Sequence, residues 1–400
     1  MSAAIHKVKK GISLKADLKG VLTGKHHLSG YQACAEGALS AGCGFLGYCP
    51  IQPSFGIVER FIERCSEAGA TFVQMEDEIS ALAAVLGAAW TGKRSMTVTS
   101  GPGLSQMMEH IGLGVMLETP CVIVDVQRDG VSEGLCYSAG AGDMMQARWG
   151  SHGDYEVIAL SPNSPQEMFD LTIQAFSLSE KYRTPVMVMS DPDVCRMQDS
   201  VTIPDPGEIK VVKRKYYKGP KDSYLPFKYD EKDLVPPMVD ISQGYRFHVT
   251  GLTHDERGYP VMNEECQEWN VHRLVNKIRL FADKLVHVEE ALTEDADVVV
   301  VSYGVASRDA LQAVQQAREE GIKAGFLRLI TVWPFPEKKI AKLAAKIQGF
   351  VVPEINFGQI SLEVERCSRG KASTHSMYHP SKEIGKSENI LKTIRKATKK

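Results

Sequence analysis

The stretch that decides the fold runs from residue 71 to residue 103 and reads TFVQMEDEISALAAVLGAAWTGKRSMTVTSGPG. A short β-prone run, Thr71–Met75, leads into an alanine-rich helical segment, Asp77–Gly92, and a second strand is predicted at Ser95–Thr99. A glycine-rich turn, Ser100–Gly103, follows that strand. This order predicts a parallel βαβ unit whose two strands end at the same edge of a sheet, which is where open α/β folds bind ligands.

Similar alternation continues on the carboxyl side of this unit. The run Pro120–Val126 is apolar apart from Asp125, as is typical of a strand buried on both faces. A long helical segment, Ser164–Tyr182, precedes another such run at Pro185–Ser190. We therefore predict an α/β fold with a doubly wound parallel sheet in the first half of the chain.

The remaining half divides into segments of different composition. Residues 201–265 are rich in Pro, Lys, Tyr and Asp and show no periodicity, which predicts an extended connector after a first domain at residues 1–200. Alternating strands and helices return from residue 296, which predicts a smaller α/β domain over residues 266–370. Residues 371–400 are interpreted as a basic tail, because Lys382–Lys400 contains six lysines and one arginine against two glutamates.

Charge and composition exclude several classes of protein. The formal net charge is -2 with 24% charged residues, so no overall field favours nucleic acid or an anionic membrane. No apolar run approaches the roughly 20 residues that span a bilayer, and the first 20 residues do not resemble a secretory signal. The nine cysteines include no CxxC pair, which argues against a zinc or iron–sulfur site in this chain and for buried thiols. We expect a soluble cytoplasmic protein without a metal site of its own.

Two other motifs do not meet the requirements of a ligand site. The segment from Gly42 to Gly47 matches GxGxxG, but a dinucleotide fingerprint requires a strand before it and a helix after it, whereas a helix is predicted before it and a Pro-rich loop after it. His248, His254 and Asp255 lack further ligands at suitable spacing. A structural role, with the histidines bonded to backbone groups, is the favoured interpretation.

The acidic residues that open the Asp77–Gly92 helix have two interpretations. Glu76 and Asp77 complement the positive end of the helix dipole, as acidic residues at helix starts commonly do. However, a glutamate placed one strand–helix–strand unit before TSGPG resembles the pyrimidine-binding domain of thiamine-diphosphate enzymes, and Glu78 is the matching position. The resemblance implies that Glu78 is catalytic and hydrogen-bonds a ring nitrogen of the cofactor's aminopyrimidine. It also implies that the cofactor is bordered by Ser100, Gly101, Pro102 and Gly103.

Further motifs resemble one branch, the 2-oxoacid:ferredoxin oxidoreductases, over most of the chain. They are Cys49-Pro50-Ile51-Gln52-Pro53-Ser54, Val124-Asp125-Val126-Gln127-Arg128, the connector segment from Phe247 to Gly258, Pro334-Phe335-Pro336, and Glu354-Ile355-Asn356-Phe357-Gly358-Gln359. The alpha subunit of this family has a pyrimidine-binding domain followed by a transketolase C-terminal-like domain. The resemblance therefore assigns these folds to the first and second domains.

The resemblance also implies a substrate site. Arg128 would lie near the carboxylate of the 2-oxoacid or near coenzyme A, since a guanidinium binds a carboxylate through two parallel bonds. The loop of Pro50, Ile51, Gln52 and Pro53 would border the substrate. Gln52 stands where the family usually has Thr, Cys49 where it has Tyr, and Tyr31 where it tends to have Asn, so the identity of the 2-oxoacid is the part of the assignment that these departures affect.

One motif of the superfamily is missing, and this points to partner chains. The Mg²⁺ that binds the diphosphate is held in the superfamily by Gly-Asp-Gly and a later Asn, whereas this chain has Gly142-Asp143-Met144 and no other match. The resemblance implies a beta subunit that carries the diphosphate, Mg²⁺ and a [4Fe–4S] cluster, gamma and ferredoxin-like delta subunits in the assembly, and coenzyme A and ferredoxin as reactants.

The expected activity is oxidative decarboxylation of a 2-oxoacid, with 2-oxoglutarate favoured, or the reverse reaction. Two alternatives remain open from the sequence. One is the corresponding subunit of a lipoamide-linked 2-oxoacid dehydrogenase, and the other is a non-catalytic scaffold subunit with the same fold.

Overall fold

Seven strands form the larger of two main sheets in the computed structural model, which describes residues 20–378 and 386–398. Their order across the sheet is β14, β8, β9, β5, β4, β2, β3, and all neighbours are parallel except β14, which is antiparallel to β8. The strands span β2 (Cys43–Tyr48), β3 (Thr71–Gln74), β4 (Arg94–Thr99), β5 (Cys121–Val126), β8 (Ile158–Leu160), β9 (Pro185–Ser190) and β14 (Thr331–Trp333).

Helices cover both faces of this sheet. The side chains of β5 show this, because they pack alternately against helices on one face and on the other. Cys121 and Ile123 pack in one buried cluster with α3 and α4, whereas Val122 and Val124 pack in another with α1, α2 and α6. A strand buried on both faces has no solvent-exposed side, and this explains why its sequence is apolar apart from Asp125. The helices are α1 (Gly30–Ser40), α2 (Phe55–Cys65), α3 (Glu78–Trp90), α4 (Pro102–Met116), α5 (Met144–Trp149), α6 (Pro165–Tyr182) and α7 (Pro192–Arg196).

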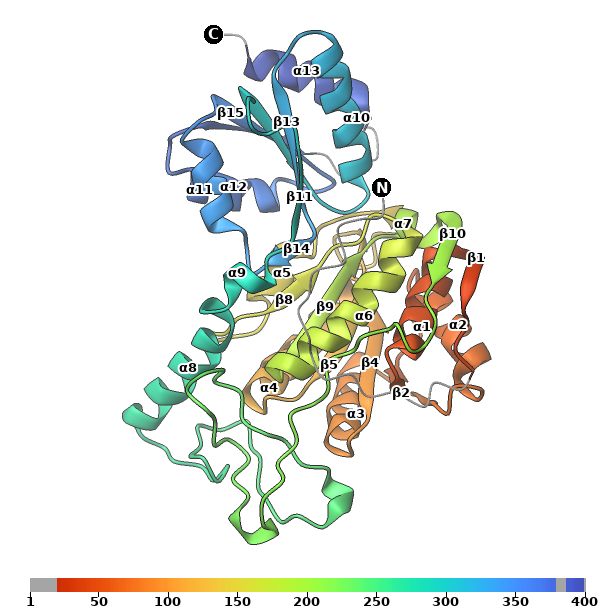
Figure 1. Ribbon diagram of the computed structural model, residues 1–400, viewed down its shortest axis with the longest axis vertical. Coiled ribbons are helices and arrows are strands. Elements are labelled where there is room, and N and C mark those ends of the chain that lie inside the picture. Colours follow the sequence, from red (N-terminus) through yellow and green to blue (C-terminus); the bar gives the residue numbers. More distant parts are fainter. Residues whose placement is uncertain (1–19, 379–385, 399–400) are drawn as a thin grey trace.

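A second, smaller α/β domain lies above the first in Figure 1. Its five-stranded sheet has the order β11, β13, β12, β15, β16, with only β11 antiparallel to its neighbour in the described part of the chain. The predicted doubly wound sheet domain followed by a smaller α/β domain is therefore confirmed. The elements are β11 (Val288–Ala291), β12 (Val298–Ser302), α10 (Ala306–Glu319), β13 (Ala324–Leu329), α11 (Glu337–Ala344), β15 (Gly349–Glu354), α12 (Gln359–Ser368), β16 (Ser373–Tyr378) and α13 (Ser387–Ala397).

The two domains share a strand and a core. Strand β14 lies within the second domain in sequence, yet it pairs with β8 at the edge of the larger sheet. Val332 and Trp333 join a buried cluster that runs from α3 and α4 to Val299 of the second sheet. The predicted boundary at residue 266 therefore does not separate the two sheets, because residues 331–333 return to the first.

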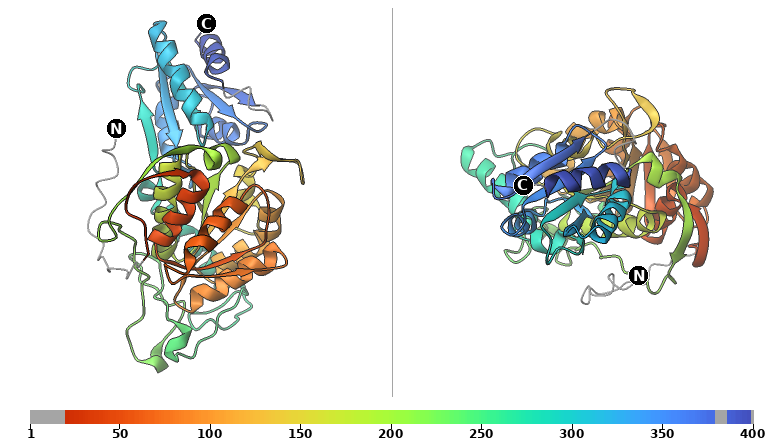
Figure 2. Two further views of the ribbon diagram at one scale, coloured as in Figure 1. Left: turned by 90° about the vertical axis from the view of Figure 1, so that its right-hand side faces the viewer. Right: turned by 90° about the horizontal axis from the view of Figure 1, so that it is seen from above.

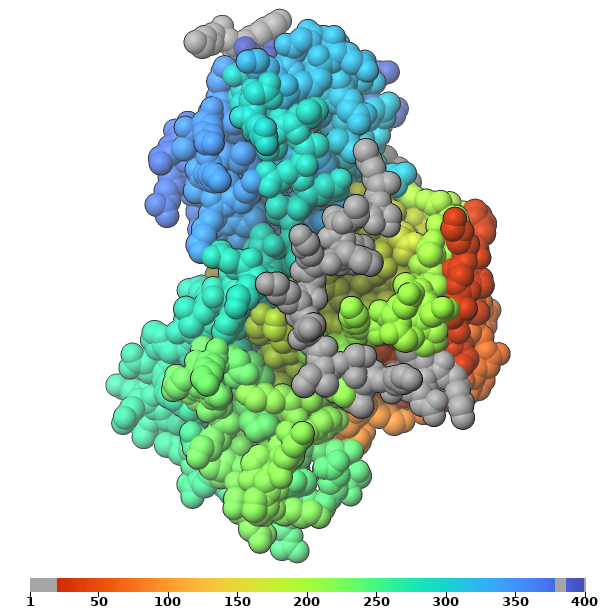
Figure 3. Space-filling model, in the orientation of Figure 1, coloured from red at the N-terminus to blue at the C-terminus, as the bar shows by residue number. Residues whose placement is uncertain are grey.

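A long connector links the domains along the lower side of the molecule (Figures 1 and 3). Its helical elements are two single-turn 3-10 helices, η1 (Lys221–Ser223) and η2 (Ile241–Gln243), in keeping with the absence of periodicity. The predicted limits of 201–265 need correction at both ends. The strand β10 (Gln198–Ile203), which pairs with β1 (Gly24–Ser29), includes residue 201, and the helix α8 (Glu264–Arg279) begins before residue 266. A short helix, α9 (Ala282–Leu285), follows α8.

The interpretation of residues 371–400 as a basic tail is wrong for the residues that the structure describes. Strand β16 is the edge strand of the smaller sheet, next to β15. In α13, Ile390, Leu391 and Ile394 are buried in a cluster with Val298 and Val300. The lysines of this helix lie on its exposed face. The prediction considered only the number of charged residues, and therefore overlooked the apolar face that packs against the domain.

A two-stranded hairpin projects from the carboxyl edge of the larger sheet. It consists of β6 (Arg128–Asp129) and β7 (Leu135–Ala139), and its tip carries the exposed side chain of Val131. Both views of Figure 2 show this hairpin, in yellow, extending away from the body of the domain. This pair of strands is not among the elements expected from the sequence.

Candidate functional site

Four segments that follow parallel strands meet at the carboxyl edge of the larger sheet. Residues 50–54 follow β2, Glu78 follows β3, residues 100–103 follow β4, and Arg128 follows β5. Because β3, β2, β4 and β5 are neighbours in that order, the sheet places all four segments side by side. The predicted site residues are thus brought to one edge, as expected for a ligand site in this type of fold.

Glu78 is the first residue of α3 and is buried, with 5% of its surface exposed. The preceding Asp77 caps the helix, since its carboxylate accepts a hydrogen bond from the amide of Ser80 at 2.7 Å. Asp77 therefore provides the N-cap hydrogen bond of the helix, and the carboxylate of Glu78 is not needed as a cap. Among the described residues, no side chain or amide hydrogen-bonds the Glu78 carboxylate, although burial makes such a bond favourable.

The glycine turn leaves room for this carboxylate. Gly101 has φ +36°, which favours glycine, and α4 begins immediately after it at Pro102. A Cβ atom placed on Gly103 would lie 2.6 Å from Oε1 of Glu78 and 2.2 Å from Oγ1 of Thr99. Glu78 therefore lies directly against the backbone of the turn, and only glycine fits at position 103.

Ser100 fixes this turn to the neighbouring strand. Its hydroxyl donates a hydrogen bond to the carbonyl of Val126, at the end of β5, over 2.8 Å. The amide of Gly103 donates to the carbonyl of Ser100. The turn after β4 is thus held in place relative to the segment that carries Arg128.

Arg128 lies in the middle of the edge and is 5% exposed. Its Nη1 donates to the backbone carbonyl of Gln52 over 2.7 Å, and its Nη2 pairs with the carboxylate of Glu133 over 2.8 Å. Its Nε faces the turn, because a Cβ on Gly101 would lie 3.5 Å from it, and this nitrogen has no hydrogen-bond partner among the described residues. Arg128 therefore connects the loop after β2 with the glycine turn and retains one unused buried donor.

The loop of residues 50–54 presents both backbone and side chains to the edge. Pro50 and Gln52 are exposed, Ile51 is half-buried and Pro53 is buried. The hydroxyl of Ser54 donates to the carbonyl of Ile51 over 2.9 Å and stabilises the loop. The contact of Gln52 with Arg128 uses its backbone carbonyl, so its side chain remains available for another group.

Two residues next to this loop depart from the family's usual pattern. Tyr31 lies against the start of α2, where a Cβ on Gly56 would be 2.9 Å from its ring, and burial raises the pKa of its phenol. Burial and the charges of Glu78 and its acidic neighbours raise the pKa of the Cys49 thiol. Cys49 is therefore a neutral thiol and not an activated nucleophile.

A pair of neighbouring carboxyl groups beside the turn, those of buried Asp125 and half-buried Asp143, was missed by the sequence reasoning. Burial and the neighbouring Asp143 raise the pKa of Asp125 well above its usual range, and burial raises the pKa of Asp143 to about 6. The amide of Gly101 faces Asp125, and Arg128 lies close to both carboxyl groups. The available signal was a single aspartate inside the apolar run Cys121–Val126.

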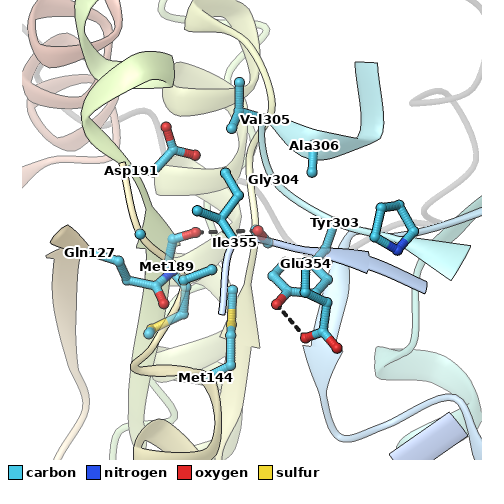
Figure 4. Close-up of a pocket in the computed structure, with 14 residues that line it drawn as sticks. Gln127, Met144, Met189, Asp191, Tyr303, Gly304, Val305, Ala306, Glu354 and Ile355 are labelled. Carbon is cyan, nitrogen blue, oxygen red and sulfur yellow. Dashed lines mark hydrogen bonds between the residues drawn. The ribbon is translucent and has the colours of Figure 1, made fainter. Parts of the chain in front are cut away.

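A small cavity lies where the carboxyl ends of the two sheets face each other (Figure 4). Gln127 and Asp191 line it from the first domain, and Tyr303 and Glu354 line it from the second. The hydroxyl of Tyr303 donates to the carboxylate of Glu354 over 2.8 Å, and Asp191 accepts hydrogen bonds from the amides of α7. The bond between Tyr303 and Glu354 lies within the second domain and the bonds of Asp191 lie within the first, so these polar groups already have partners in their own domains.

The two motifs that did not meet the requirements of a ligand site have structural roles. Nδ1 of His248 bonds the carbonyl of Gly258 over 2.6 Å, and Nδ1 of His254 bonds that of Leu252 over 2.8 Å, which confirms the prediction of backbone partners. The GxGxxG segment contains β2 itself, where a Cβ on Gly47 would be 2.9 Å from the carbonyl of Ala81 in α3.

The cysteines, all of which lie in the described part of the chain, form no disulfide. All nine are free thiols, and six of them are buried. Within the described ranges, no helix is both long and apolar enough to cross a bilayer.

Comparison with known proteins identifies the family. Residues 36–271 match the family model described as pyruvate flavodoxin/ferredoxin oxidoreductase, thiamine-diphosphate binding, and residues 296–393 match pyruvate:ferredoxin oxidoreductase core domain II. The chain is 49% identical to the 2-oxoglutarate synthase subunit KorA of Methanothermobacter thermautotrophicus over 94% of this chain and 99% of that one. It is 35% identical to the ketoisovalerate oxidoreductase subunit VorB of Methanothermobacter marburgensis, over 85% of this chain and 89% of that one.

Solved structures agree with these matches. The structure of 2-oxoglutarate:ferredoxin oxidoreductase from Magnetococcus marinus, with 2-oxoglutarate, coenzyme A and succinyl-CoA bound, superposes with a TM-score of 0.88 at 30% identity. The match covers 94% of this chain and 66% of that one. A split-gene transketolase, described as an inactive beta4 tetramer, shares the fold with a TM-score of 0.50 at 12% identity, over 93% of this chain and 98% of that one. The chain therefore belongs to the 2-oxoacid:ferredoxin oxidoreductase family, in which it is similar to the KorA subunits of 2-oxoglutarate synthases.

Proposed function

We propose that this chain is the pyrimidine-side subunit of a 2-oxoglutarate:ferredoxin oxidoreductase. In the proposed reaction, 2-oxoglutarate and coenzyme A give succinyl-CoA, CO₂ and a proton, and two electrons pass singly to ferredoxin. The reverse reaction uses the same site. The names of the KorA relatives and the ligands of the Magnetococcus marinus structure support this substrate.

The observation that carries the proposal is the buried carboxylate of Glu78 at the ligand edge, which has no hydrogen-bond partner among the described residues. Asp77 already caps α3, and Gly103 leaves space beside Oε1 of Glu78. These features fit a carboxylate that hydrogen-bonds a nitrogen of the flat aminopyrimidine ring of thiamine diphosphate. When bound, thiamine diphosphate supplies a carbanion for attack on the keto carbon and acts as an electron sink for decarboxylation.

Each remaining residue of the edge has a positioning role in this proposal. Arg128 binds the carboxylate of the 2-oxoacid, since its guanidinium is held between the loop after β2 and the glycine turn. Pro50, Ile51, Gln52 and Pro53 border the substrate. Ser100, Gly101, Pro102 and Gly103 border the pyrimidine and exclude water from Glu78, which strengthens a hydrogen bond there.

The rest of the active site is assigned to other chains. The sequence lacks the Gly-Asp-Gly motif that would bind Mg²⁺ and the diphosphate. We assign this half to a beta subunit, which also carries a [4Fe–4S] cluster, and we place gamma and ferredoxin-like delta subunits in the same assembly. Exposed apolar side chains at Phe72, Val73 and Ile79 flank Glu78 and offer a surface for the beta subunit.

The test is Glu78→Ala in the reconstituted complex, with ferredoxin or viologen reduction measured at saturating 2-oxoglutarate. We expect a loss of about 10²–10⁴-fold in kcat, the range typical of removing a group that assists proton transfer. Glu76→Gln is the matched control, because Glu76 is exposed and lies only two residues away.

The outcomes separate the alternatives. Unchanged reduction in the Glu78→Ala complex would contradict the proposal and favour a scaffold subunit. Co-purification with a lipoyl acyltransferase in place of an iron-containing chain would favour a lipoamide-linked dehydrogenase. The matches to ferredoxin-linked relatives support the oxidoreductase.

A further inference from the structure

Arg128 already holds a carboxylate that belongs to this chain. Nη2 of Arg128 lies 2.8 Å from Oε2 of Glu133, which is on the turn of the β6–β7 hairpin. The two side chains differ greatly in exposure, at 3% for Arg128 and 85% for Glu133. The contact therefore joins a buried cation to a solvent-exposed anion.

The two partners depend on this contact to different degrees. Glu133 is exposed enough to be solvated by water if the contact breaks. Arg128 would retain only the carbonyl of Gln52, because its Nε has no partner among the described residues. Asp125 and Asp143 lie near the guanidinium, but among the described residues only the carboxylate of Glu133 hydrogen-bonds it, so loss of Glu133 leaves the Nη2 donor without a protein partner.

The hairpin can release Glu133 without disturbing the fold. The pairing of Arg128 with Ala139 joins its own two strands, which are only two and five residues long, and the carbonyl of Tyr137 accepts a hydrogen bond from Arg196 of α7 over 2.9 Å. The side chains of Val131, Leu135 and Tyr137 are 93%, 66% and 61% exposed, so the hairpin buries little apolar surface against this chain. The exposed turn that carries Glu133 can therefore rearrange while β7 stays against α7.

We propose that Glu133 is an internal competitor for the substrate carboxylate. In the free enzyme it occupies Arg128, and the carboxylate of the incoming 2-oxoacid displaces it. This inference rests on the proposed role of Arg128 in substrate binding. The exchange replaces one carboxylate by another, so the charge that faces Arg128 and the nearby pair Asp125 and Asp143 remains the same.

The consequence is a lower apparent affinity for the substrate. Part of the interaction between Arg128 and the 2-oxoacid is offset by the loss of the Glu133 contact. Because Glu133 is solvent-exposed, its contact with Arg128 contributes little net free energy and shifts the binding equilibrium by roughly 1.5- to 5-fold. Glu133 therefore sets the concentration range over which the enzyme responds to its 2-oxoacid.

The test measures KM and kcat for 2-oxoglutarate in the reconstituted complex that carries Glu133→Gln. We expect KM to fall by roughly two- to fivefold and kcat/KM to rise by the same factor. Glu320→Gln is the matched control, because Glu320 pairs with Arg395 in the second domain and lies far from the edge in sequence and fold. A purely structural role of Glu133 would lower the melting temperature and leave KM unchanged.

A second substitution, Arg128→Lys, separates failure of this inference from failure of the proposed function. If Arg128→Lys raises KM while Glu133→Gln leaves it unchanged or raises it, Arg128 binds substrate and the competition is refuted. If Arg128→Lys leaves KM unchanged, the assignment of Arg128 itself is refuted, and the inference with it. A fall in KM with Glu133→Gln together with a rise with Arg128→Lys supports both.

Discussion

The carboxylate of Glu118 lies 2.7 Å from the guanidinium of Arg273, although 155 residues separate them in the chain. Lys277 binds the other oxygen of Glu118 over 2.8 Å, and Arg183 donates from Nε to its backbone carbonyl. All four side chains are buried. This cluster attaches α8 to the end of α4, and Arg183 extends it to the connector through the carbonyl of Pro226.

Glu118→Gln is expected to destabilise the chain strongly. The substitution leaves three buried cations without their common anion, and breaking a buried ion pair on one side costs about 3–5 kcal/mol. Urea unfolding at neutral pH, followed by circular dichroism, measures the change. Glu109→Gln on α4, the helix that precedes Glu118, is the control, because Glu109 is exposed and its substitution should change the free energy of unfolding by less than about 0.5 kcal/mol.

The same cluster predicts a loss of stability in acid. Burial opposes ionisation of Glu118, but the charges of Arg273, Lys277 and Arg183 outweigh this and lower its pKa to about 2. Because the folded pKa is below the unfolded value of about 4.3, the stabilisation is complete above that value and is lost as the pH falls toward about 2. The Glu118→Gln variant should lack this part of the acid transition, and an identical acid profile in both proteins would refute the assignment.

Asp143→Asn is expected to act in the opposite direction on the pH scale. Burial raises the pKa of Asp143 to about 6 in the folded chain, above its pKa in the unfolded chain. Between these two pKa values the folded chain therefore binds more protons than the unfolded chain. The corresponding stability is complete below about pH 4 and is lost as the pH rises through about 6. Urea unfolding at several pH values should therefore show that the free energy of unfolding of the Asp143→Asn variant rises relative to that of the wild type over this pH range, by on the order of 1–2 kcal/mol.

The exposed Asp154→Asn is the matched control for this prediction, because Asp154 lies in the same region of the chain but is not buried. A difference between the Asp143→Asn variant and the wild type that does not change with pH would show that folding does not raise the pKa of Asp143.

Trp333→Phe is expected to weaken the attachment of the second domain to the larger sheet. The indole of Trp333 donates to the carbonyl of Met144 over 2.9 Å and fills the core that both domains share. Loss of this hydrogen bond and of buried volume should cost about 1–3 kcal/mol in thermal or urea unfolding. Trp149→Phe is the control, because Trp149 is 53% exposed. Equal effects of the two substitutions would contradict the role of Trp333.

The sequence predicted those parts of the fold that local patterns determine. The apolar run of β5, the alanine-rich helix after Asp77 and the glycine turn at 101–103 each carry a strong local signal, and together they located the ligand edge. The strand β14 was not predicted, because its residues pair with the distant strand β8 and are too few to show a periodicity of their own.

The missed parts of the candidate site have the same physical origin. Asp125 and Asp143 lie on different elements, and only the fold brings their carboxyl groups together. Glu133 is one acidic residue in a glycine-rich segment, and its meaning comes from the arginine at the base of the same hairpin. In α13, by contrast, the apolar stripe of Ile390 and Ile394 was visible, and the interpretation as a tail gave too much weight to charge.

Gly103→Ala should inactivate the complex with little effect on the fold outside the site. The added Cβ would lie 2.6 Å from Oε1 of Glu78 and 2.2 Å from Oγ1 of Thr99, so the Glu78 side chain must move. A displacement of about 1 Å at a reacting group can cost about a hundredfold in rate, and we expect a loss of that size in ferredoxin reduction.

Gly87→Ala is a matched control on the helix that carries Glu78, because a Cβ there meets no described atom within 4 Å. Alanine at this helical position should raise the free energy of unfolding by about 0.5–1 kcal/mol and preserve activity. Full activity of the Gly103→Ala complex would mean that Glu78 does not need its place against the turn, and the proposed contact with the cofactor would be refuted.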